Sequence, residues 1–257
     1  MIDKDIIIDI YPSGQKEVAK VKNPKYGICI RKIKKDAVTP KRIIRELEIQ
    51  DKLDCEYYPH LFYSDTSNNQ IIIYEEFIEG ETLSKIFENN SKYKANEIEC
   101  LKLLKQLIIG LNYIWDKDIV HRDLKPQNII IRDNGMPVIL DLGIAKILDG
   151  TNNSTTIWYT PGYAPPEQFL GNLNINKRTD FFSLGVIIYE LFYGRRLFLN
   201  NDEVLNKIPN YNINGFNVSN EFIKILKMLI EKQMYKRYRK QEHILKDIEG
   251  ILERNKV

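Results

Sequence analysis

Residues 119–133 read IVHRDLKPQNIIIRD, and this stretch, with LDLG at residues 140–143, decides how the rest of the sequence is interpreted. Two carboxylates, Asp123 and Asp141, an amide at Asn128 and an ammonium at Lys125 form a compact polar set between apolar segments that favour strands. Magnesium ions that bridge phosphates require hard oxygen ligands, and a hydroxyl nucleophile requires a nearby carboxylate. The stretch therefore predicts a polar site suited to binding Mg²⁺ and to activating a hydroxyl nucleophile.

The hydrophobic period of the sequence changes once, near residue 80. The first part carries strand-like runs and one helical segment at residues 40–53; the strand-like runs are residues 6–11, 17–21, 27–33 and 70–77. Beyond residue 81 helical patterns dominate, at residues 95–117, 180–194, 220–232 and 242–253. This organisation predicts an α+β fold in which a small sheet-rich lobe, residues 1–77, joins a larger helical lobe, residues 78–257.

Composition excludes several classes of protein. The chain has 257 residues, 43% of them hydrophobic and 28% charged, which is typical of a folded globular protein with a sizeable core. A net charge of +3 argues against nucleic-acid binding as the main role. Cys29, Cys55 and Cys100 lie far apart without a CxxC pair, so we expect neither a zinc site nor a disulfide framework. The longest apolar stretch is too short to span a bilayer, and we expect a cytoplasmic protein without a membrane segment.

The order HRDxKxxN, then DxG, then a PPE segment resembles the serine/threonine protein kinases, of the bacterial type that shares the eukaryotic fold. The resemblance covers nearly the whole chain. It implies a bilobal fold made of one kinase domain over residues 1–257, with ATP and Mg²⁺ as cofactors. It also implies a protein substrate, not identified by the sequence, that carries serine or threonine hydroxyls. Lys125, together with Thr160 in YTPGY, is the serine/threonine-type pattern.

The same resemblance implies a role for each residue of the polar set. Asp123 would accept or orient the proton of the substrate hydroxyl, and Lys125 would steady the transferring phosphoryl group. Asn128 and Asp141 would hold the two magnesium ions. These four residues are the predicted catalytic residues, and the last two are the predicted metal ligands.

Three further residues of the large lobe match structural positions of the family. Glu167 in PPE is expected to form a buried pair with Arg237 in YKRYR, and Asp180 is expected to brace the catalytic loop from the following helix. In this family an arginine such as Arg122 often docks a phosphate on the activation loop, because a phosphate gains several charge-assisted hydrogen bonds from arginine. The candidate acceptors are Thr151, Ser154, Thr155 and Thr156.

The small lobe resembles the family only in part. The third strand of the family carries Ala-x-Lys, whose lysine binds the α- and β-phosphates and pairs with a helix glutamate. Aligned on ICIRKI, these positions are Cys29 and Arg31, so that arginine replaces lysine. Glu46 matches the helix glutamate, with Glu48 as the alternative. Arginine keeps the charge but does not put a point charge where an ammonium sat, and such a replacement usually weakens a kinase.

The glycine-rich loop is also degenerate. YPSGQKEV at residues 11–18 stands where the family has GxGxxGxV, and it keeps Gly14 and, against the adenine, Val18. Lys16 replaces the third glycine, which resembles the with-no-lysine kinases, where this loop supplies the phosphate-binding lysine. The alternative is that Lys16 is an ordinary loop lysine in solvent.

The hinge between the lobes is ambiguous by one residue. One alignment places Glu75 at the gate of the adenine pocket and Glu76, Phe77 and Ile78 on the hinge, where backbone groups would bind adenine; the other places Tyr74 at the gate. A buried Glu75 is costly unless it is paired. Glu76 and Ile78 are the predicted adenine-contacting positions.

Two functions remain open at this level. The first is an active Mg·ATP-dependent serine/threonine kinase, since the large lobe has every residue needed for the chemistry. The second is a pseudokinase that binds a nucleotide or a partner without transferring phosphate. Arg31 and the degenerate loop favour the second.

Overall fold

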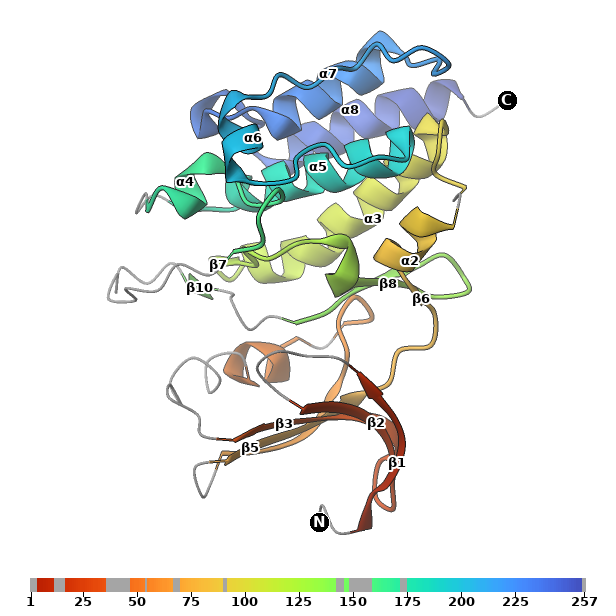
Figure 1. Ribbon diagram of the computed structural model, residues 1–257, viewed down its shortest axis with the longest axis vertical. Coiled ribbons are helices and arrows are strands. Elements are labelled where there is room, and N and C mark those ends of the chain that lie inside the picture. Colours follow the sequence, from red (N-terminus) through yellow and green to blue (C-terminus); the bar gives the residue numbers. More distant parts are fainter. Residues whose placement is uncertain are drawn as a thin grey trace.

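The computed structural model describes residues 4–11, 17–35, 47–53, 55–66, 70–89, 92–141, 146–147, 159–171 and 175–255. In these residues a five-stranded antiparallel sheet forms one lobe, and a second, larger lobe consists mainly of helices (Figure 1). The predicted α+β, two-lobed fold is confirmed. The two lobes are connected through residues 77–80, which follow the last strand of the sheet.

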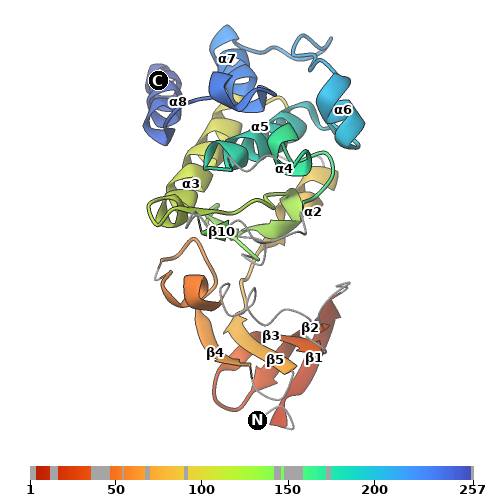
Figure 2. The same ribbon diagram turned by 90° about the vertical axis from the view of Figure 1, so that its left-hand side faces the viewer.

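The small lobe is built on one sheet with the strand order β1-β2-β3-β5-β4, and Figure 2 shows these strands side by side. Its strands are β1 (Ile6–Tyr11), β2 (Glu17–Asn23), β3 (Gly27–Lys35), β4 (Leu61–Asp65) and β5 (Gln70–Glu76). Four of them lie where the runs of β-branched residues predicted strands. β4 was not predicted, because LFYSD is short and lacks a regular alternation of apolar and polar residues.

The two faces of this sheet have different surroundings. On the inner face Ile71 and Ile73 pack with Leu47, which belongs to the helical stretch 47–51. On the outer face a second cluster contains Ala19, Val21, Cys29 and Tyr74. Consecutive residues of β3 point to opposite faces, so a shift of one residue exchanges helix-facing for outward-facing side chains.

The large lobe is organised around two long helices, α3 (Glu97–Trp115) and α5 (Arg178–Tyr193), which contribute much of one large core cluster. Every residue of α5 from Thr179 onward is buried, as expected for a central helix. The remaining helices are α2 (Leu83–Glu88), α4 (Pro166–Phe169), α6 (Asn201–Asn206), α7 (Asn220–Ile230) and α8 (Gln241–Arg254). Within the described ranges, none of the helices combines the length and the apolar character needed to cross a bilayer.

Short elements at the base of the large lobe carry the sequence stretch quoted above. They are β6 (Glu81–Thr82), β7 (Ile119–Val120), the 3₁₀ turn η2 (Pro126–Asn128), β8 (Ile129–Ile131), β9 (Pro137–Ile139) and β10 (Lys146–Ile147); a second 3₁₀ turn, η3 (Met234–Lys236), precedes α8. Gly80, where the hinge meets β6, has a φ of 145° and lies against the carbonyl of Ile131. A side chain at this position would collide with that carbonyl, so the close crossing of hinge and β8 requires glycine.

Candidate active site

A buried aspartate, Asp180, holds the start of the predicted catalytic loop, which is the HRDLKPQN stretch at residues 121–128. Asp180 accepts hydrogen bonds from the backbone N–H groups of His121 and Arg122, each at 2.9 Å, and from Trp115 Nε1 at 2.8 Å. Asp180 is fully buried, and this burial raises its pKa above the ordinary value even though the three donors and His121 act in the opposite direction. The predicted brace from the following helix is confirmed.

The ring of His121 connects the catalytic loop with the end of β9. Its Nε2 lies 3.2 Å from the carbonyl oxygen of Leu140, and its Nδ1 accepts a hydrogen bond from the backbone N–H of Asp123 at 3.3 Å. An accepting Nδ1 requires the proton to be on Nε2, which then donates to Leu140. Sequence reasoning gave His121 no role, although its place in HRD was a usable signal.

Asp123 and Lys125 form a polar cluster with Thr160. Lys125 Nζ lies 3.0 Å from Asp123 Oδ2 and 3.1 Å from Thr160 Oγ1, and the Thr160 hydroxyl donates to Asp123 Oδ1. The side chains of Asp123 and Lys125 remain 11% and 24% exposed, so a substrate group can approach them. The cluster therefore presents a carboxylate beside an ammonium, as proton acceptance and phosphoryl stabilisation require.

Asn128 is fixed by hydrogen bonds to Asp123. Its Nδ2 donates to the Asp123 carbonyl at 2.9 Å and to Asp123 Oδ2 at 3.3 Å. The donating side of the amide is thus engaged, and Oδ1 is the atom that a cation would use. The backbone N–H of Leu140 donates to the Asn128 carbonyl at 2.8 Å, which brings Asp141, the next residue, close to Asn128.

These oxygen donors fit Mg²⁺. In the part of the chain that the structure describes, no three or more His, Cys, Asp or Glu side chains gather as a metal site, and the candidate ligands are the side-chain oxygens of Asn128 and Asp141. Mg²⁺ suits such an incomplete set, because it keeps waters and binds substrate phosphates through one or two protein oxygens. Asp141 has a φ of 60° and Arg122 a φ of 69°, left-handed conformations that cost energy outside glycine and often mark functional sites.

A buried ion pair between Glu167 and Arg237 lies in the large lobe near the catalytic loop. Arg237 Nη1 and Nη2 lie 2.6 and 2.9 Å from the two carboxylate oxygens of Glu167, and the side chains are 0% and 5% exposed. The predicted pairing is confirmed. The next residue, Gln168, donates to the Arg122 carbonyl at 2.7 Å, so α4 is tied to the catalytic loop.

Arg31 and Cys29 lie on the outer face of the small-lobe sheet. Arg31 Nη1 pairs with Asp5 Oδ2 at 3.0 Å and Nη2 with Glu17 Oε1 at 2.9 Å, and Cys29 is buried in the outer apolar cluster. Both differ from the sequence-based prediction, which directed them toward the nucleotide. The reason is strand register, because β3 turns its odd-numbered residues away from the helical stretch 47–51.

Lys32 takes the inward position on β3. Its Nζ lies 2.6 Å from Glu75 Oε1, and Gln50, from the helical stretch 47–51, donates to Glu75 Oε2 at 3.0 Å. Sequence reasoning missed this lysine. Matching the family signature to Ile30-Arg31-Lys32, one residue further along, would have found it, and so would the requirement that a buried Glu75 has a partner.

The other residues predicted to contact the nucleotide from the small lobe and the hinge do not lie on one surface. Val18 pairs with Lys32 across β2 and β3, so both share the inner face. Tyr74 is on the outer face, where its hydroxyl donates to Asp5, which leaves Glu75 as the inward residue at the gate. Glu76 Oε1 binds Arg132 Nη2 at 2.8 Å, and Ile78 is buried in the hinge. Other predicted positions fall outside the described residues: Gly14, Lys16, Glu46, Thr151, Ser154, Thr155 and Thr156.

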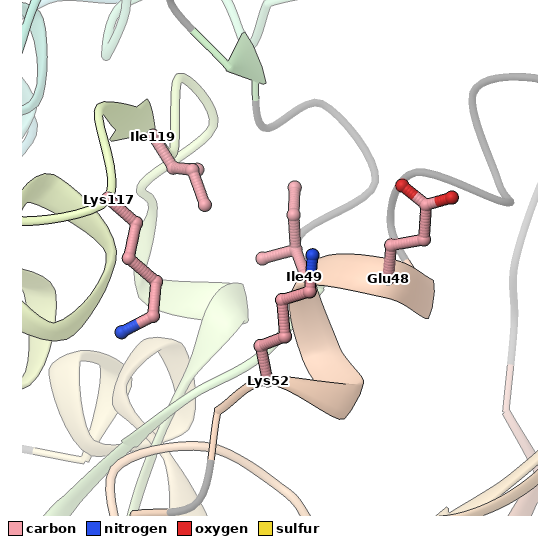
Figure 3. Close-up of a pocket in the computed structure, with 5 residues that line it drawn as sticks. All are labelled: Glu48, Ile49, Lys52, Lys117 and Ile119. Atoms are coloured by element: carbon pink, nitrogen blue, oxygen red, sulfur yellow. The ribbon is translucent and has the colours of Figure 1, made fainter.

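A separate pocket lies between the helical stretch 47–51 and β7. Figure 3 shows its lining residues, with Ile49 and Ile119 extending into the space between the two elements. Glu48, the alternative helix glutamate, also lines this pocket, with Lys52 and Lys117. None of the four predicted catalytic residues contributes to its lining, so it is not the site described above.

Comparison with known proteins identifies similar sequences. A family model described as protein kinase domain matches residues 14–247. Two probable serine/threonine-protein kinases of Dictyostelium discoideum are each 30% identical, over 210 and 238 residues, covering 70% and 86% of this chain. A probable serine/threonine-protein kinase of Clostridium acetobutylicum is 34% identical over 134 residues, 51% of this chain and 20% of its own length.

This chain spans only part of the length of its relatives. The matched regions cover 44% and 34% of the two Dictyostelium proteins, so this chain spans less than half of the length of those curated relatives. The relatives come from eukaryotes as well as from a bacterium, so the bacterial subtype stays a prediction.

Proposed function

This chain belongs to the protein kinase family, and we propose that it transfers the γ-phosphoryl group of ATP to serine or threonine hydroxyls of proteins. The arrangement of Asp123, Lys125 and Thr160 carries this proposal, because a carboxylate suited to accept a proton lies beside an ammonium suited to stabilise phosphate charge. The names of the relatives, which are serine/threonine kinases, support the choice of acceptor.

The proposed mechanism gives each group one task. Asp123 accepts the proton of the attacking hydroxyl, and Lys125 stabilises the charge on the transferring group. Asn128 and Asp141 would hold Mg²⁺, which would supply positive charge to neutralise the phosphates. His121 and Asp180 fix the loop on which Asp123 stands, so that its carboxylate needs little reorganisation.

We assign the phosphate-binding role of the third strand to Lys32. Its place on the inner face, opposite Val18, supports this assignment over Arg31, whose guanidinium is bound on the outer face. Under this assignment, the hypothesis that Lys16 replaces a missing strand lysine is no longer needed. Under the same assignment, the pseudokinase alternative is left with only the degenerate glycine-rich loop at residues 11–18 in its favour.

We further propose that the protein acts in the cytoplasm on protein substrates. Among the residues that the structure describes, no disulfide bond joins Cys29, Cys55 and Cys100, as is usual in a reducing compartment. The identity of the substrate is not specified by the residues described above.

Incubation with γ-labelled ATP, Mg²⁺ and a panel of unstructured proteins tests the proposal. We expect label in the protein fraction, and acid hydrolysis should release phosphoserine or phosphothreonine. Chelation of magnesium should abolish the transfer. Binding of Mg·ATP without any transfer to the panel or to the chain itself would favour the pseudokinase instead.

A further inference from the structure

A buried glutamate, Glu75, contacts the inward lysine on the inner face of the small-lobe sheet. Glu75 stands on β5 opposite Ile30, and Lys32 is its diagonal neighbour on the same face of the sheet. The Nζ to Oε1 distance is 2.6 Å, and the side chains of Lys32 and Glu75 are 11% and 6% exposed. The pair is thus largely removed from water.

Both oxygens of the Glu75 carboxylate are engaged. Oε2 accepts from Gln50 Nε2 at 3.0 Å, and the same amide nitrogen lies 3.4 Å from the Pro59 carbonyl oxygen. Gln50 is itself buried. One carboxylate therefore joins β3, β5 and the helical stretch 47–51, and its own orientation is fixed by the helix.

This arrangement restricts the lysine. A lysine side chain has four rotatable bonds and loses much conformational freedom when its ammonium is held in one place. An unpaired charge buried in this environment would cost much free energy, so the Lys32 ammonium and the Glu75 carboxylate stay in contact. Glu75 and Gln50 thus hold the Lys32 ammonium at a defined point of the inner wall before any nucleotide binds.

Resting on the proposed function, we propose that Glu75 is a positioning residue that acts through Lys32. Glu75 sets where the lysine ammonium stands relative to the nucleotide phosphates, and Gln50 supports it by orienting the carboxylate. The position that the sequence predicts as the gate of the adenine pocket would thereby be part of the phosphate-binding machinery. Glu75 itself need not touch ATP.

A double-mutant cycle tests this assignment. Glu75→Gln keeps the size of the side chain and removes its charge, and Lys32→Met removes the ammonium. We expect Glu75→Gln alone to lower kcat/KM for ATP by about ten- to hundred-fold, mostly through kcat, as for a misplaced catalytic group. In the Lys32→Met background the same change should cost less than about two-fold, because residues that act as one unit are not additive.

Two further variants separate positioning from folding. Gln50→Leu should lower kcat less than Glu75→Gln does, and this loss should also be absent in the Lys32→Met background. If Glu75→Gln does not fold, Gln50→Leu takes its place in the cycle. Glu190→Gln is the matched control, because Glu190 is 1% exposed and paired with Arg196 at 2.9 Å in the large lobe. It should lower the thermal midpoint while leaving the KM for ATP unchanged.

The outcomes are distinct. Equal fold losses from Glu75→Gln in both backgrounds would overturn the assignment, and so would an increase in activity, which would mean that the glutamate restrains the lysine. If the wild-type chain transfers no phosphate, the proposed function fails, and the cycle is then measured on the Kd of Mg·ATP. In that case, a change of at least about three-fold in the Kd caused by Glu75→Gln, which disappears in the Lys32→Met background, supports the positioning role. The same change in Kd in both backgrounds refutes it.

Discussion

Arg31 Nη1 lies 3.0 Å from Asp5 Oδ2 in an ion pair buried on the outer face of the small-lobe sheet. The same carboxylate accepts hydrogen bonds from Tyr74 Oη and Asn23 Nδ2, both at 2.7 Å. The other terminal nitrogen of Arg31 reaches Glu17, 2.9 Å away. The arginine therefore connects the segment before β1 and the start of β2 with β3, a structural task remote from the inner face.

Loss of this arginine should destabilise the fold. Arg31→Met leaves Asp5, whose side chain is 0% exposed, without its cation, and we expect the free energy of unfolding to fall by about 3 to 5 kcal/mol. Arg31→Lys should cost less, because an ammonium can still pair with Asp5 but does not have the fork that also reaches Glu17. Urea denaturation measures both values, and an unchanged midpoint for Arg31→Met would show that the pair contributes nothing.

The sequence alone does not show whether Arg31 or Lys32 is the inward-facing residue of β3. The position of β3 was predicted from its isoleucines, but the face of each residue depends on a register that the sequence alone left ambiguous by one position. In the alignment that we propose, Ile30 takes the place of the family's alanine, and the arginine directly before Lys32 offers the competing match. Only the pairing of Lys32 with Glu75 and of Arg31 with Asp5 distinguishes the two alignments.

The large lobe was more predictable, because its motifs are contiguous and in a fixed order. The motifs predict structural roles for Asp180, Glu167 and Arg237, and each of these residues is buried with its expected partner. Helices α3, α5, α7 and α8 begin and end within about three residues of their predicted limits, as strong periodicity allows. The short helices α2 and α6, by contrast, have too few turns to produce a periodic signal.

Thr160 offers a test of the catalytic cluster. Thr160→Val keeps the shape of the side chain but removes the hydroxyl that bonds Asp123 and Lys125. We expect kcat to fall by an amount equivalent to about 1 to 3 kcal/mol, since two polar groups lose their shared partner. Thr160→Ser, which retains the hydroxyl, is the control and should preserve most of the activity. Steady-state kinetics with saturating ATP compares them, and equal rates for the valine variant and the wild type would contradict the role.

The pair between Glu167 and Arg237 should be essential for stability. Glu167→Gln leaves the guanidinium of Arg237, which is fully buried, without its counter-charge, and we expect a loss of about 3 to 5 kcal/mol. Glu221→Gln is the control at an exposed pair, where Glu221 and Arg254 are 57% and 64% exposed and 3.6 Å apart. That variant should change stability by less than about 0.5 kcal/mol. Similar denaturation midpoints for the two variants would be inconsistent with a structural role for the buried pair.

The division of labour between Asp123 and Asp141 is the most direct test of the proposed kinase activity. Asp141→Asn should weaken Mg·ATP binding, because its carboxylate is assigned to the metal. Asp123→Asn should lower kcat by about 10² to 10⁴-fold, with an almost unchanged Kd for Mg·ATP, because its carboxylate is assigned to the acceptor proton. The decisive measurement is therefore labelled phosphate transfer by Asp123→Asn, with Mg·ATP binding followed by calorimetry on the same sample. The account predicts retained binding with transfer nearly abolished, and transfer at the wild-type rate would contradict it.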